Sequence, residues 1–460
     1  MNDVTNPTFE QRRDSGRAMR LDTPRISLAD LVDRPSSYDP ISELIAQGND
    51  RVQSLLPIRY ARMLESPFAF YRGAAMLMAH DLSRGPSTTL DVQICGDAHL
   101  SNFGVFSSPE RQLVFDINDF DETEIGPFEW DVKRLVTSLT IASEQLGHRA
   151  SQQENVAVCA AHEYRTAMVD FSLMSRLEVW YATLDLASAM KELRGFFSSP
   201  ERVRVDDIFR RVKAKAPPAA FAKVITYESG APCFVNKPPH FMPLASNGDS
   251  HLRRKDVDEI VTRYASTLST DRQALLRQFE IRDVARHVVG VGSVGTECLA
   301  VLLTGRNEHD PLLLQIKEAQ TSVITSARGL PSSLEPGDRV VRGQRMMQAT
   351  PDVLLGWHTL DTTSQHRSFY VRQLYDNKAS VDFTVLDESL LIAYAKVCAW
   401  TLARAHARSG RSAEIAGYLG KSRRFDEAMA SFALQYQKRN ASDYRAMRDA
   451  VQQGRLRVQA

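Results

Sequence analysis

Two short acidic motifs stand close together in the first third of the chain. Residues 96–102 read GDAHLSN, which places the carboxylate of Asp97 and the amide of Asn102 on one loop behind an apolar run. Residues 115–122 read FDINDFDE, which places three aspartates behind a second apolar run. Hard cations bind through such oxygen atoms, and a site with few protein carboxylates leaves room for phosphate and water. A loop aspartate can also accept the proton of a hydroxyl nucleophile in phosphoryl transfer.

Both motifs also have a purely structural interpretation. Asp and Asn are common in turns because their side chains bond to their own backbone, so an acidic strand end is often only a solvated turn. The occurrence of two such motifs side by side favours a site for a nucleotide and Mg²⁺ over two unrelated turns.

The run from Asp97 to Asp131 resembles the catalytic core of aminoglycoside and choline kinases in the protein-kinase-like superfamily. That core reads HGD-x-H-x-x-N, then an aspartate that closes a strand, then a GDPAWDLA-type helix start, and residues 118–131 match the second half without a gap. The resemblance implies that Asp119 binds metal and that Asp131 caps its helix and braces the catalytic loop. Cys95 departs from the pattern, because the kinases usually have His there.

The whole chain resembles a second family more closely. The segments RGAAMLMAHDL, GDAHLSNFG and LARAHARSG, with the run FDINDFDET-x-x-GPFEWD, are similar to the bacterial domain of unknown function 2252 family. That family has no established activity to carry over, so this resemblance bears on fold more than on function.

A glycine-rich segment follows at residues 289–305 (VGVGSVGTECLAVLLTG). Gly290, Gly292 and Gly295 would let the backbone approach a phosphate, because glycine has no Cβ to clash. The segment leads into a β-rich run, a turn and a strand that ends in Lys317, whereas a dinucleotide-binding fingerprint would open a helix. This order resembles the small lobe of protein kinases. An ordinary hairpin with a surface lysine is the alternative.

The glycine segment follows the acidic motifs, whereas it precedes them in ordinary kinases. Chain termini tend to lie close together at the surface, so circular permutation can preserve a fold. The sequence therefore predicts an α+β, two-lobed protein-kinase-like fold in permuted order. Its expected parts are a disordered segment over residues 1–25, a helix-rich large lobe over 26–280, a small lobe with the glycine loop and hinge over 281–380, and helices returning to the large lobe over 381–460.

The hydrophobic pattern predicts the elements that would carry these motifs. Strands are predicted at 90–95, 112–117, 298–304, 312–316 and 368–378, helices within 43–82, 128–196, 252–280, 340–349, 390–406 and 425–454, and a long loop over 216–250. Arg72, in the first helical stretch, could reach a phosphate, although a surface or capping arginine is the simpler interpretation.

Two features fit the kinase comparison poorly. A kinase lysine is positioned by a glutamate on the following helix, but residues 340–349 contain none, and Gln344 is only a polar substitute. The related family also often has an acid shortly after His406, where this chain has Arg411.

Composition limits the class of protein. At 460 residues the chain can form more than one lobe. A net charge of +1 favours neither nucleic acid nor membrane as a partner, and five scattered cysteines without C-x-x-C spacing argue against disulfides and zinc. The N-terminus has no apolar signal region and no run approaches the length of a membrane span, so we expect a cytoplasmic protein.

The sequence thus predicts Mg²⁺- and ATP-dependent phosphoryl transfer to a hydroxyl of an unknown small molecule or protein. The expected site residues are Asp97 as base or orienter; Asn102 and Asp119, with Asp116 in reserve, as metal ligands; Lys317, Gly290, Gly292 and Gly295 as nucleotide contacts; and Asp131 as a structural brace. If Lys317 and Asp119 face one nucleotide, their heads should lie roughly 4–8 Å apart.

Three alternatives to phosphoryl transfer stay open. A kinase-like fold can also transfer AMP instead of phosphate. The missing glutamate partner of the lysine favours a catalytically silent nucleotide-binding protein. A metal-dependent phosphoesterase would need several further histidine ligands in compatible geometry.

Overall fold

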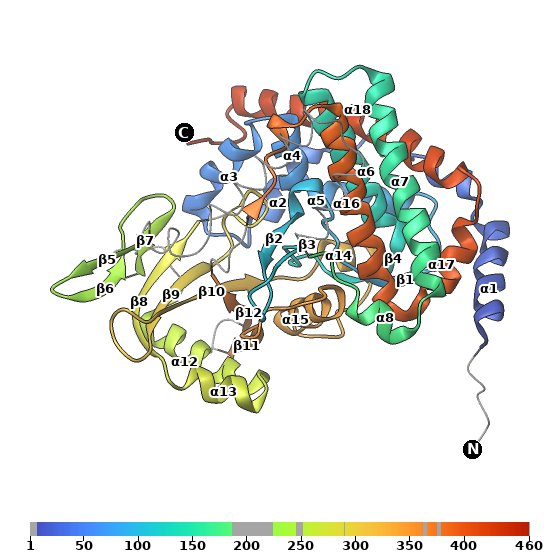
Figure 1. Ribbon diagram of the computed structural model, residues 1–460. Helices are drawn as coiled ribbons and strands as arrows, with labels where there is room; N and C mark the ends of the chain where they lie inside the picture. Colours follow the sequence, from blue (N-terminus) through green and yellow to red (C-terminus); the bar gives the residue numbers. More distant parts are fainter. Residues whose placement is uncertain are drawn as a thin grey trace.

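The structure, a computed structural model, describes residues 7–185, 224–244, 252–288, 290–361, 366–374 and 379–459. It is a mixed α+β fold in which long helices gather on one side and an antiparallel sheet lies on the other (Figure 1). Among the described residues, no helix combines the length and the apolar character needed to cross a membrane.

The largest sheet has six antiparallel strands in the order β11-β12-β10-β9-β8-β7. In chain order these are β7 (Phe241–Pro243), β8 (Glu280–His287), β9 (Cys298–Thr304), β10 (Pro311–Ala319), β11 (Gly356–Asp361) and β12 (His366–Gln373). Every residue of β9 is buried, which fits its continuous apolar run in the middle of the sheet. Between β10 and β11 the chain forms α14 (Val323–Arg328) and α15 (Pro336–Met347), and α15 packs against β10, β11 and β12.

Two helices that the sequence assigned to the large lobe pack on this sheet instead. Helices α12 (Arg254–Tyr264) and α13 (Thr270–Leu276) bury apolar side chains such as Val257 and Ile260 against Leu299 and Val301 of β9. Strand β7 forms the edge of the same sheet, and the hairpin of β5 (Ile225–Glu228) and β6 (Ala231–Phe234) lies beside it (Figure 1). The part of the chain that forms the six-stranded sheet and the helices packed on it therefore begins before residue 280, the expected end of the large lobe.

The helical side holds four long helices and two short ones among the described residues, and they share one apolar core. These are α6 (Phe128–Gln145), α7 (Ala150–Leu173), α8 (Arg176–Tyr181), α16 (Glu388–His406), α17 (Ser412–Leu419) and α18 (Arg424–Gln452). Helix α16 packs along α7, and α18 packs against both α6 and α7 (Figure 1). The end of the chain thus lies against the helices that follow the acidic motifs. The expected helices over 186–196 and part of the expected hinge, residues 375–378, lie outside the described residues.

Four short helices precede the acidic motifs: α2 (Pro40–Gly48), α3 (Leu56–Met63), α4 (Pro67–Gly73) and α5 (Ala75–Arg84). Their apolar residues form a cluster that includes Tyr60 and Phe70 and also takes in Met447 of α18 and Val291 of the glycine segment. This cluster joins the start of the chain to its end and to the sheet side.

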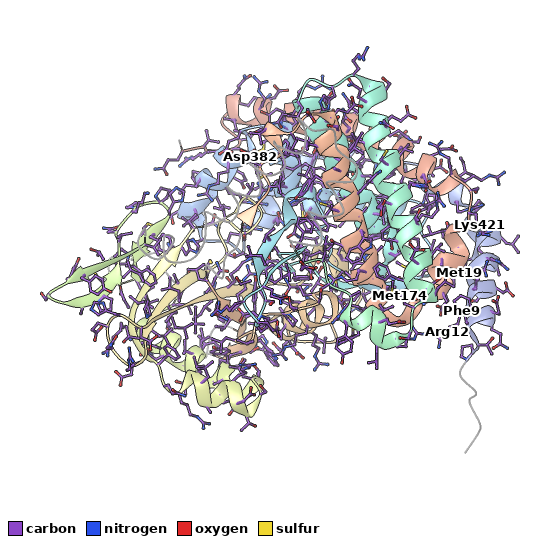
Figure 2. All side chains as sticks on the ribbon, in the orientation of Figure 1. Phe9, Arg12, Met19, Met174, Asp382 and Lys421 are labelled. Atoms are coloured by element: carbon purple, nitrogen blue, oxygen red, sulfur yellow. The ribbon has the colours of Figure 1, made fainter. Side chains whose placement is uncertain are left out.

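The N-terminus corrects one expectation, because residues 9–22 form a helix, α1 (Phe9–Asp22), rather than a disordered segment. Thr8 caps it, and its partner is α17: Gly16 lies so close that a Cβ would meet the carbonyl oxygen of Glu414 at 1.9 Å. Arg20 donates to the carbonyl oxygens of Gly417 and Tyr418. Figure 2 shows α1 at the edge of the helical side, beside the C-terminal helices. Packing through a glycine and arginine–carbonyl bonds leaves almost no apolar pattern to detect.

Two small antiparallel sheets position the acidic motifs. Strand β1 (Asp91–Ile94) pairs with β4 (Glu124–Pro127), and β2 (Phe103–Ser107) pairs with β3 (Leu113–Ile117) and β13 (Ala379–Ser380). Phe103, the first residue of β2, lies opposite Ile117, the last residue of β3, so the loop before β2 and the loop after β3 lie at the same end of their sheet. Ile94 at the end of β1 lies opposite Glu124 at the start of β4 in the other sheet. The strand pairing therefore brings residues 95–102 and 118–123 together.

Candidate functional site

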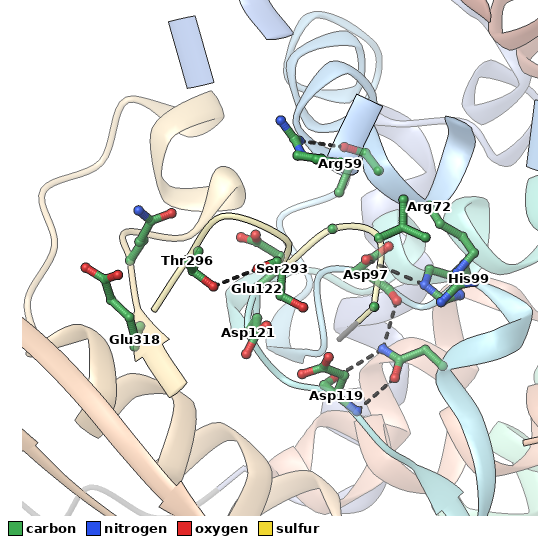
Figure 3. Close-up of a pocket in the computed structure, with 18 of the residues that line it drawn as sticks. Arg59, Arg72, Asp97, His99, Asp119, Asp121, Glu122, Ser293, Thr296 and Glu318 are labelled. Atoms are coloured by element: carbon green, nitrogen blue, oxygen red, sulfur yellow. Dashed lines mark hydrogen bonds and ion pairs between the residues drawn. The ribbon is translucent and has the colours of Figure 1, made fainter. Parts of the chain in front are cut away.

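A cavity of about 270 Å³ opens where the two acidic loops meet the glycine segment and helices α3 and α4 (Figure 3). Its lining includes five of the predicted site residues: Asp97, Asn102, Asp119, Gly290 and Gly292. Of the remaining predicted residues, Lys317 does not line the cavity itself but forms ion pairs with Asp119 and Asp121, which do. Gly295, Asp131 and Asp116 are not among the lining residues.

Asn102 ties the two acidic loops to each other. Its Nδ2 donates to the carbonyl oxygens of Asp97 (3.0 Å) and Asp119 (2.9 Å), and its Oδ1 accepts from the Asp119 backbone N–H (2.8 Å). The amide is buried and fixed in position. An amide oxygen has two lone pairs, so Oδ1 keeps one that could face a cation.

Lys317 joins the second acidic motif to the six-stranded sheet. Its Nζ lies 3.4 Å from Oδ1 of Asp119 and 2.5 Å from Oδ2 of Asp121, and its side chain is only 2% exposed. The two predicted partners do meet, but closer than the expected range, because Lys317 and Asp119 form a direct ion pair. Burial alone would lower the pKa of Lys317, but the two carboxylates outweigh it and hold that pKa well above its usual value.

Asp121 is a site residue that the sequence did not single out. Besides its ion pair with Lys317, it accepts a hydrogen bond from the Tyr370 hydroxyl (2.6 Å), and Tyr370 lies opposite Lys317 across β10 and β12. The available signal was its spacing: it follows Asp119 by two residues with the buried Phe120 between them, so both carboxylates turn toward the cleft.

Asp97 lines the cavity from the first acidic loop. Arg134 of α6 donates from Nε to its Oδ1 (2.8 Å), and the Asp97 side chain stays 22% exposed. Burial raises the pKa of Asp97 above its usual value, although Arg134 opposes that shift. Burial lowers the pKa of the neighbouring His99 well below its usual range, so this imidazole is neutral at physiological pH. Arg134 thus fixes the position of the Asp97 carboxylate, and this side chain remains partly exposed to the cavity.

Asp131 braces the first acidic loop from below. Its two carboxylate oxygens accept the backbone N–H groups of Cys95 (2.7 Å) and Gly96 (2.9 Å), and Nε2 of His406 lies 3.2 Å from Oδ2. Asp131 is not the cap of its helix, since α6 already begins at Phe128. Gly96 is required at this bend: its φ is +77°, and a Cβ would meet the carbonyl oxygen of Glu122 at 2.2 Å.

Asp116, the predicted reserve metal ligand, is used elsewhere. Its buried carboxylate accepts from Arg404 (2.5 Å) and from the backbone N–H groups of Ile117 (2.8 Å) and Ala349 (3.0 Å). These bonds fasten β3 to α16 and to the end of α15, outside the cavity. An aspartate at a strand end therefore serves the fold here, as the structural interpretation of the motif allowed.

The glycine segment forms a turn that is held against the helical side by two arginines. Nη1 of Arg51 donates to the carbonyl oxygens of Gly292 (2.7 Å) and Val294 (2.6 Å), and Nη1 of Arg62 donates to that of Gly290 (2.6 Å). Gly290 and Gly295 have positive φ values of +77° and +96°, which a side chain would disfavour. Arginine bonds to carbonyl groups have no fixed spacing in a sequence, so no signal pointed to Arg51 or Arg62.

Helix α15 positions the acidic loop rather than the lysine. Its Arg339 donates to the carbonyl oxygens of Asp121 (2.8 Å), Gln320 (2.9 Å) and Thr123. Gln344, considered as a substitute for the missing glutamate, bonds instead to Gln348 (2.9 Å). The carboxylates that pair with Lys317 therefore come from the acidic loop, and the helix acts on them through their backbone.

The oxygen atoms at the cavity fit a Mg²⁺ ion that keeps water and phosphate ligands. The side chains of Asp119 and Asp121 are 41% and 30% exposed, and Asn102 offers one further lone pair. Across the ranges that the structure describes, no three His, Cys, Asp or Glu side chains are grouped as ligands for a metal ion. One or two carboxylates with substrate phosphate is the usual Mg²⁺ arrangement, whereas an all-protein cage is not.

A pH-dependent contribution to stability is expected from Glu122, which lines the cavity and accepts the backbone N–H of Val323 (2.7 Å). Burial raises the pKa of this carboxyl to about 6. When the pKa of a carboxyl group is higher in the folded than in the unfolded protein, the group contributes stability at pH values below the unfolded-state pKa. This contribution is lost as pH rises through the folded-state pKa. Relative to Glu122→Gln, the wild-type free energy of unfolding should fall by about 2 kcal/mol as pH rises from about 4 to 7.

Urea unfolding of both proteins across this pH range measures that difference. The glutamine keeps an acceptor for the Val323 N–H, and the other titrating groups cancel between the two proteins. A difference that stays constant with pH would contradict the assignment to Glu122.

Comparison with known proteins identifies one family. The model of a family described as an uncharacterized protein conserved in bacteria (DUF2252) matches residues 51–450, which include both acidic motifs, the glycine turn and α16. No curated protein and no solved structure matches the chain. The similarity to the bacterial family is thereby confirmed, and the resemblance to kinases rests on the motifs themselves.

Proposed function

The chain belongs to the DUF2252 family of bacterial proteins, and we propose that this protein is an Mg²⁺- and ATP-dependent phosphotransferase with a permuted kinase-like arrangement. One observation carries the proposal: Lys317 at the end of β10 reaches Asp119 at the end of the acidic motif. In kinases the corresponding lysine and aspartate act on one phosphate chain, the lysine directly and the aspartate through metal. A surface lysine on an unrelated hairpin has no reason to lie at this place.

The order of elements around Lys317 supports the same function. A strand (β8), the glycine turn, two further strands (β9 and β10), the short helix α14, helix α15 and two more strands (β11 and β12) follow one another. Kinase small lobes present a glycine-rich loop, then a strand with the lysine, then a helix. In this chain the segment follows the acidic motifs, so the kinase-like reading requires a permuted connection.

The chemistry then divides among the residues of the cavity. Asp97 orients the acceptor hydroxyl and takes its proton as the acceptor oxygen bonds to the γ-phosphorus, while the bond to the bridging oxygen breaks and ADP leaves. Lys317 places a positive charge on the phosphate chain. Asp119, with the spare lone pair of Asn102, would hold Mg²⁺, which offsets the charge of the phosphate oxygens when bound.

One observation favours a silent nucleotide-binding protein as the second candidate. Lys317 is already bound by Asp119 and Asp121, and in the described part of the chain α15 pairs no carboxylate with it, since Asp338 of that helix pairs with Arg342. A nucleotide would have to draw Lys317 away from these carboxylates. In this case ATP binds without turnover.

Asp97→Asn separates the two candidates. We expect the variant to keep the Mg²⁺–ATP-dependent rise in melting temperature and to lose turnover by roughly 10²–10⁴-fold, the usual contribution of a positioned base. Because the pKa of Asp97 is raised and the base must be ionised, wild-type turnover should fall as pH is lowered through that pKa. ADP release and thermal melting are the two measurements.

Asp258→Asn on α12 is a matched control, because this half-exposed aspartate pairs only with a surface arginine in the described part of the chain. Normal ADP release by Asp97→Asn would remove Asp97 as the base. A wild-type protein that gains stability from Mg²⁺–ATP but releases no ADP would establish the silent alternative. If Mg²⁺–ATP fails to change the melting temperature, neither candidate stands.

A further inference from the structure

Three arginines from the helices and loop before the acidic motifs line one wall of the cavity: Arg51, Arg59 and Arg72. Arg59 is fully buried: its Nη2 donates to Oε1 of Gln47 (2.7 Å) and to the carbonyl oxygen of Gly73 (3.0 Å), whereas its Nε and Nη1 have no hydrogen-bond partner among the described residues. The Nε atoms of Arg51 and Arg72 are also buried and have no hydrogen-bond partner among the described residues. A buried donor without a partner costs free energy, so the wall of the cavity contains donors that no group among the described residues uses.

The carboxylates around the cavity are engaged with other groups. Asp97 is paired with Arg134, and Asp119 and Asp121 are paired with Lys317. Glu318 forms a two-bond ion pair with Arg367 at 2.9 and 2.8 Å, and Glu122 accepts a backbone N–H. Within the ranges that the structure describes, none of the three arginines forms an ion pair with a carboxylate.

These arginines keep their charge despite burial. Burial lowers the pKa of all three, and it lowers that of Arg59 to about 9, with Arg51 adding to the effect there. A guanidinium with a pKa of about 9 is still a cation at neutral pH. Like charges held together away from water are unfavourable unless an anion joins them.

We propose that Arg51, Arg59 and Arg72 bind an anionic group, a phosphate or a carboxylate, carried by the acceptor substrate. The planar fork of a guanidinium matches the two oxygens of such a group. This inference rests on the proposed function, since it concerns the molecule that receives the phosphoryl group.

The position of Arg72 assigns the anion to the acceptor rather than to ATP. Figure 3 shows Arg72 beside Asp97 and His99, on the part of the cavity where the acceptor hydroxyl must meet its base. The phosphates of the nucleotide are assigned to Lys317 and Asp119 instead. An acceptor that bears a hydroxyl and an anionic group can span from Asp97 to this arginine wall.

Inorganic phosphate is the probe, with sodium chloride at equal ionic strength as its blank. We expect phosphate to raise the melting temperature of the wild-type protein, and a non-hydrolysable ATP analogue with Mg²⁺ to raise it further when both are present. In Arg59→Gln and Arg72→Gln the affinity for phosphate should fall at least about tenfold, since a charge-assisted hydrogen bond is lost. Both variants should keep the shift caused by the ATP analogue.

The apo melting temperature gives a second readout. In Arg72→Gln, removing a cation that forms no ion pair or side-chain hydrogen bond within the described residues should leave the apo melting temperature unchanged or raise it, whereas loss of a structural arginine would lower it; Arg59→Gln also loses the bonds to Gln47 and Gly73, so it is not used for this readout. Arg263→Gln on α12, where the arginine is 65% exposed, is the matched control and should keep every shift. If Arg59→Gln does not fold, Arg72→Gln decides by the same measurements together with calorimetric titration of phosphate.

Three results would overturn the proposal: no phosphate shift in the wild-type protein, a full shift in both variants, or competition between phosphate and the ATP analogue with both shifts lost in the variants. The last result would assign the arginines to the phosphates of ATP. A phosphate shift without any nucleotide shift would keep the anion site and remove the phosphotransferase, so the two failures are distinguishable.

Discussion

Asp119→Asn is expected to abolish the Mg²⁺-dependent stabilisation by ATP and to lower turnover by more than about 100-fold, because loss of a supporting residue alone already costs 10–100-fold at metal sites. The apo protein should stay folded. Its Asp119 backbone keeps both bonds to Asn102, and Lys317 keeps its shorter ion pair with Asp121. Melting with ATP, with and without Mg²⁺, measures the first effect, and ADP release measures the second.

Asp116→Asn gives a direct comparison at the same motif. Because Asp116 fastens β3 to Arg404 and to the end of α15, this variant should lower the apo melting temperature and keep the Mg²⁺–ATP shift. An unchanged Mg²⁺–ATP shift in Asp119→Asn would take Asp119 out of the metal site. Loss of that shift in Asp116→Asn alone would return Asp116 to it.

Asp131→Ala is expected to lower the free energy of unfolding by roughly 3–5 kcal/mol. Two buried N–H groups, those of Cys95 and Gly96, lose their acceptors, and each such loss costs about 1–3 kcal/mol. His406 loses its partner as well. This effect exceeds that of a helix cap, about 0.5–2 kcal/mol. Urea unfolding measures it through the midpoint and slope of the transition.

Asp131→Asn is the matched variant, because the amide keeps one acceptor oxygen and should lose only about half as much stability. Turnover should fall in both variants, since the loop that carries Asp97 loses its brace. An Asp131→Ala protein that unfolds like wild type would show that the loop holds its shape without this carboxylate.

Local patterns predicted most elements that carry the site. The strand at 298–304 coincides with β9, and the helix at 390–406 lies within α16, because continuous apolar runs and a helical apolar stripe are local signals. The approach of Lys317 to Asp119 was also predicted, since the resemblance to kinases implies that both face one nucleotide.

The remaining features depend on contacts that leave no local pattern. The arginines that bind backbone carbonyls, Arg51, Arg62 and Arg339, contact residues far away in the sequence, and a carbonyl group is the same in every residue. The role of Asp116 was not predictable either. Its residue type and place at a strand end match those of a metal ligand, and only its bond to Arg404 on α16 shows its structural use.

The anchoring of the glycine turn has a consequence for the entropy of ligand binding. Glycines lose more conformational freedom on ordering than any other residue, and a flexible loop must lose it when a ligand arrives. Here Arg51 and Arg62 bind three carbonyl groups of the turn, and Val291 is buried in the cluster of helices α2 to α5. The turn is therefore ordered as the chain folds, and a ligand that binds beneath it meets backbone whose disorder has already been lost.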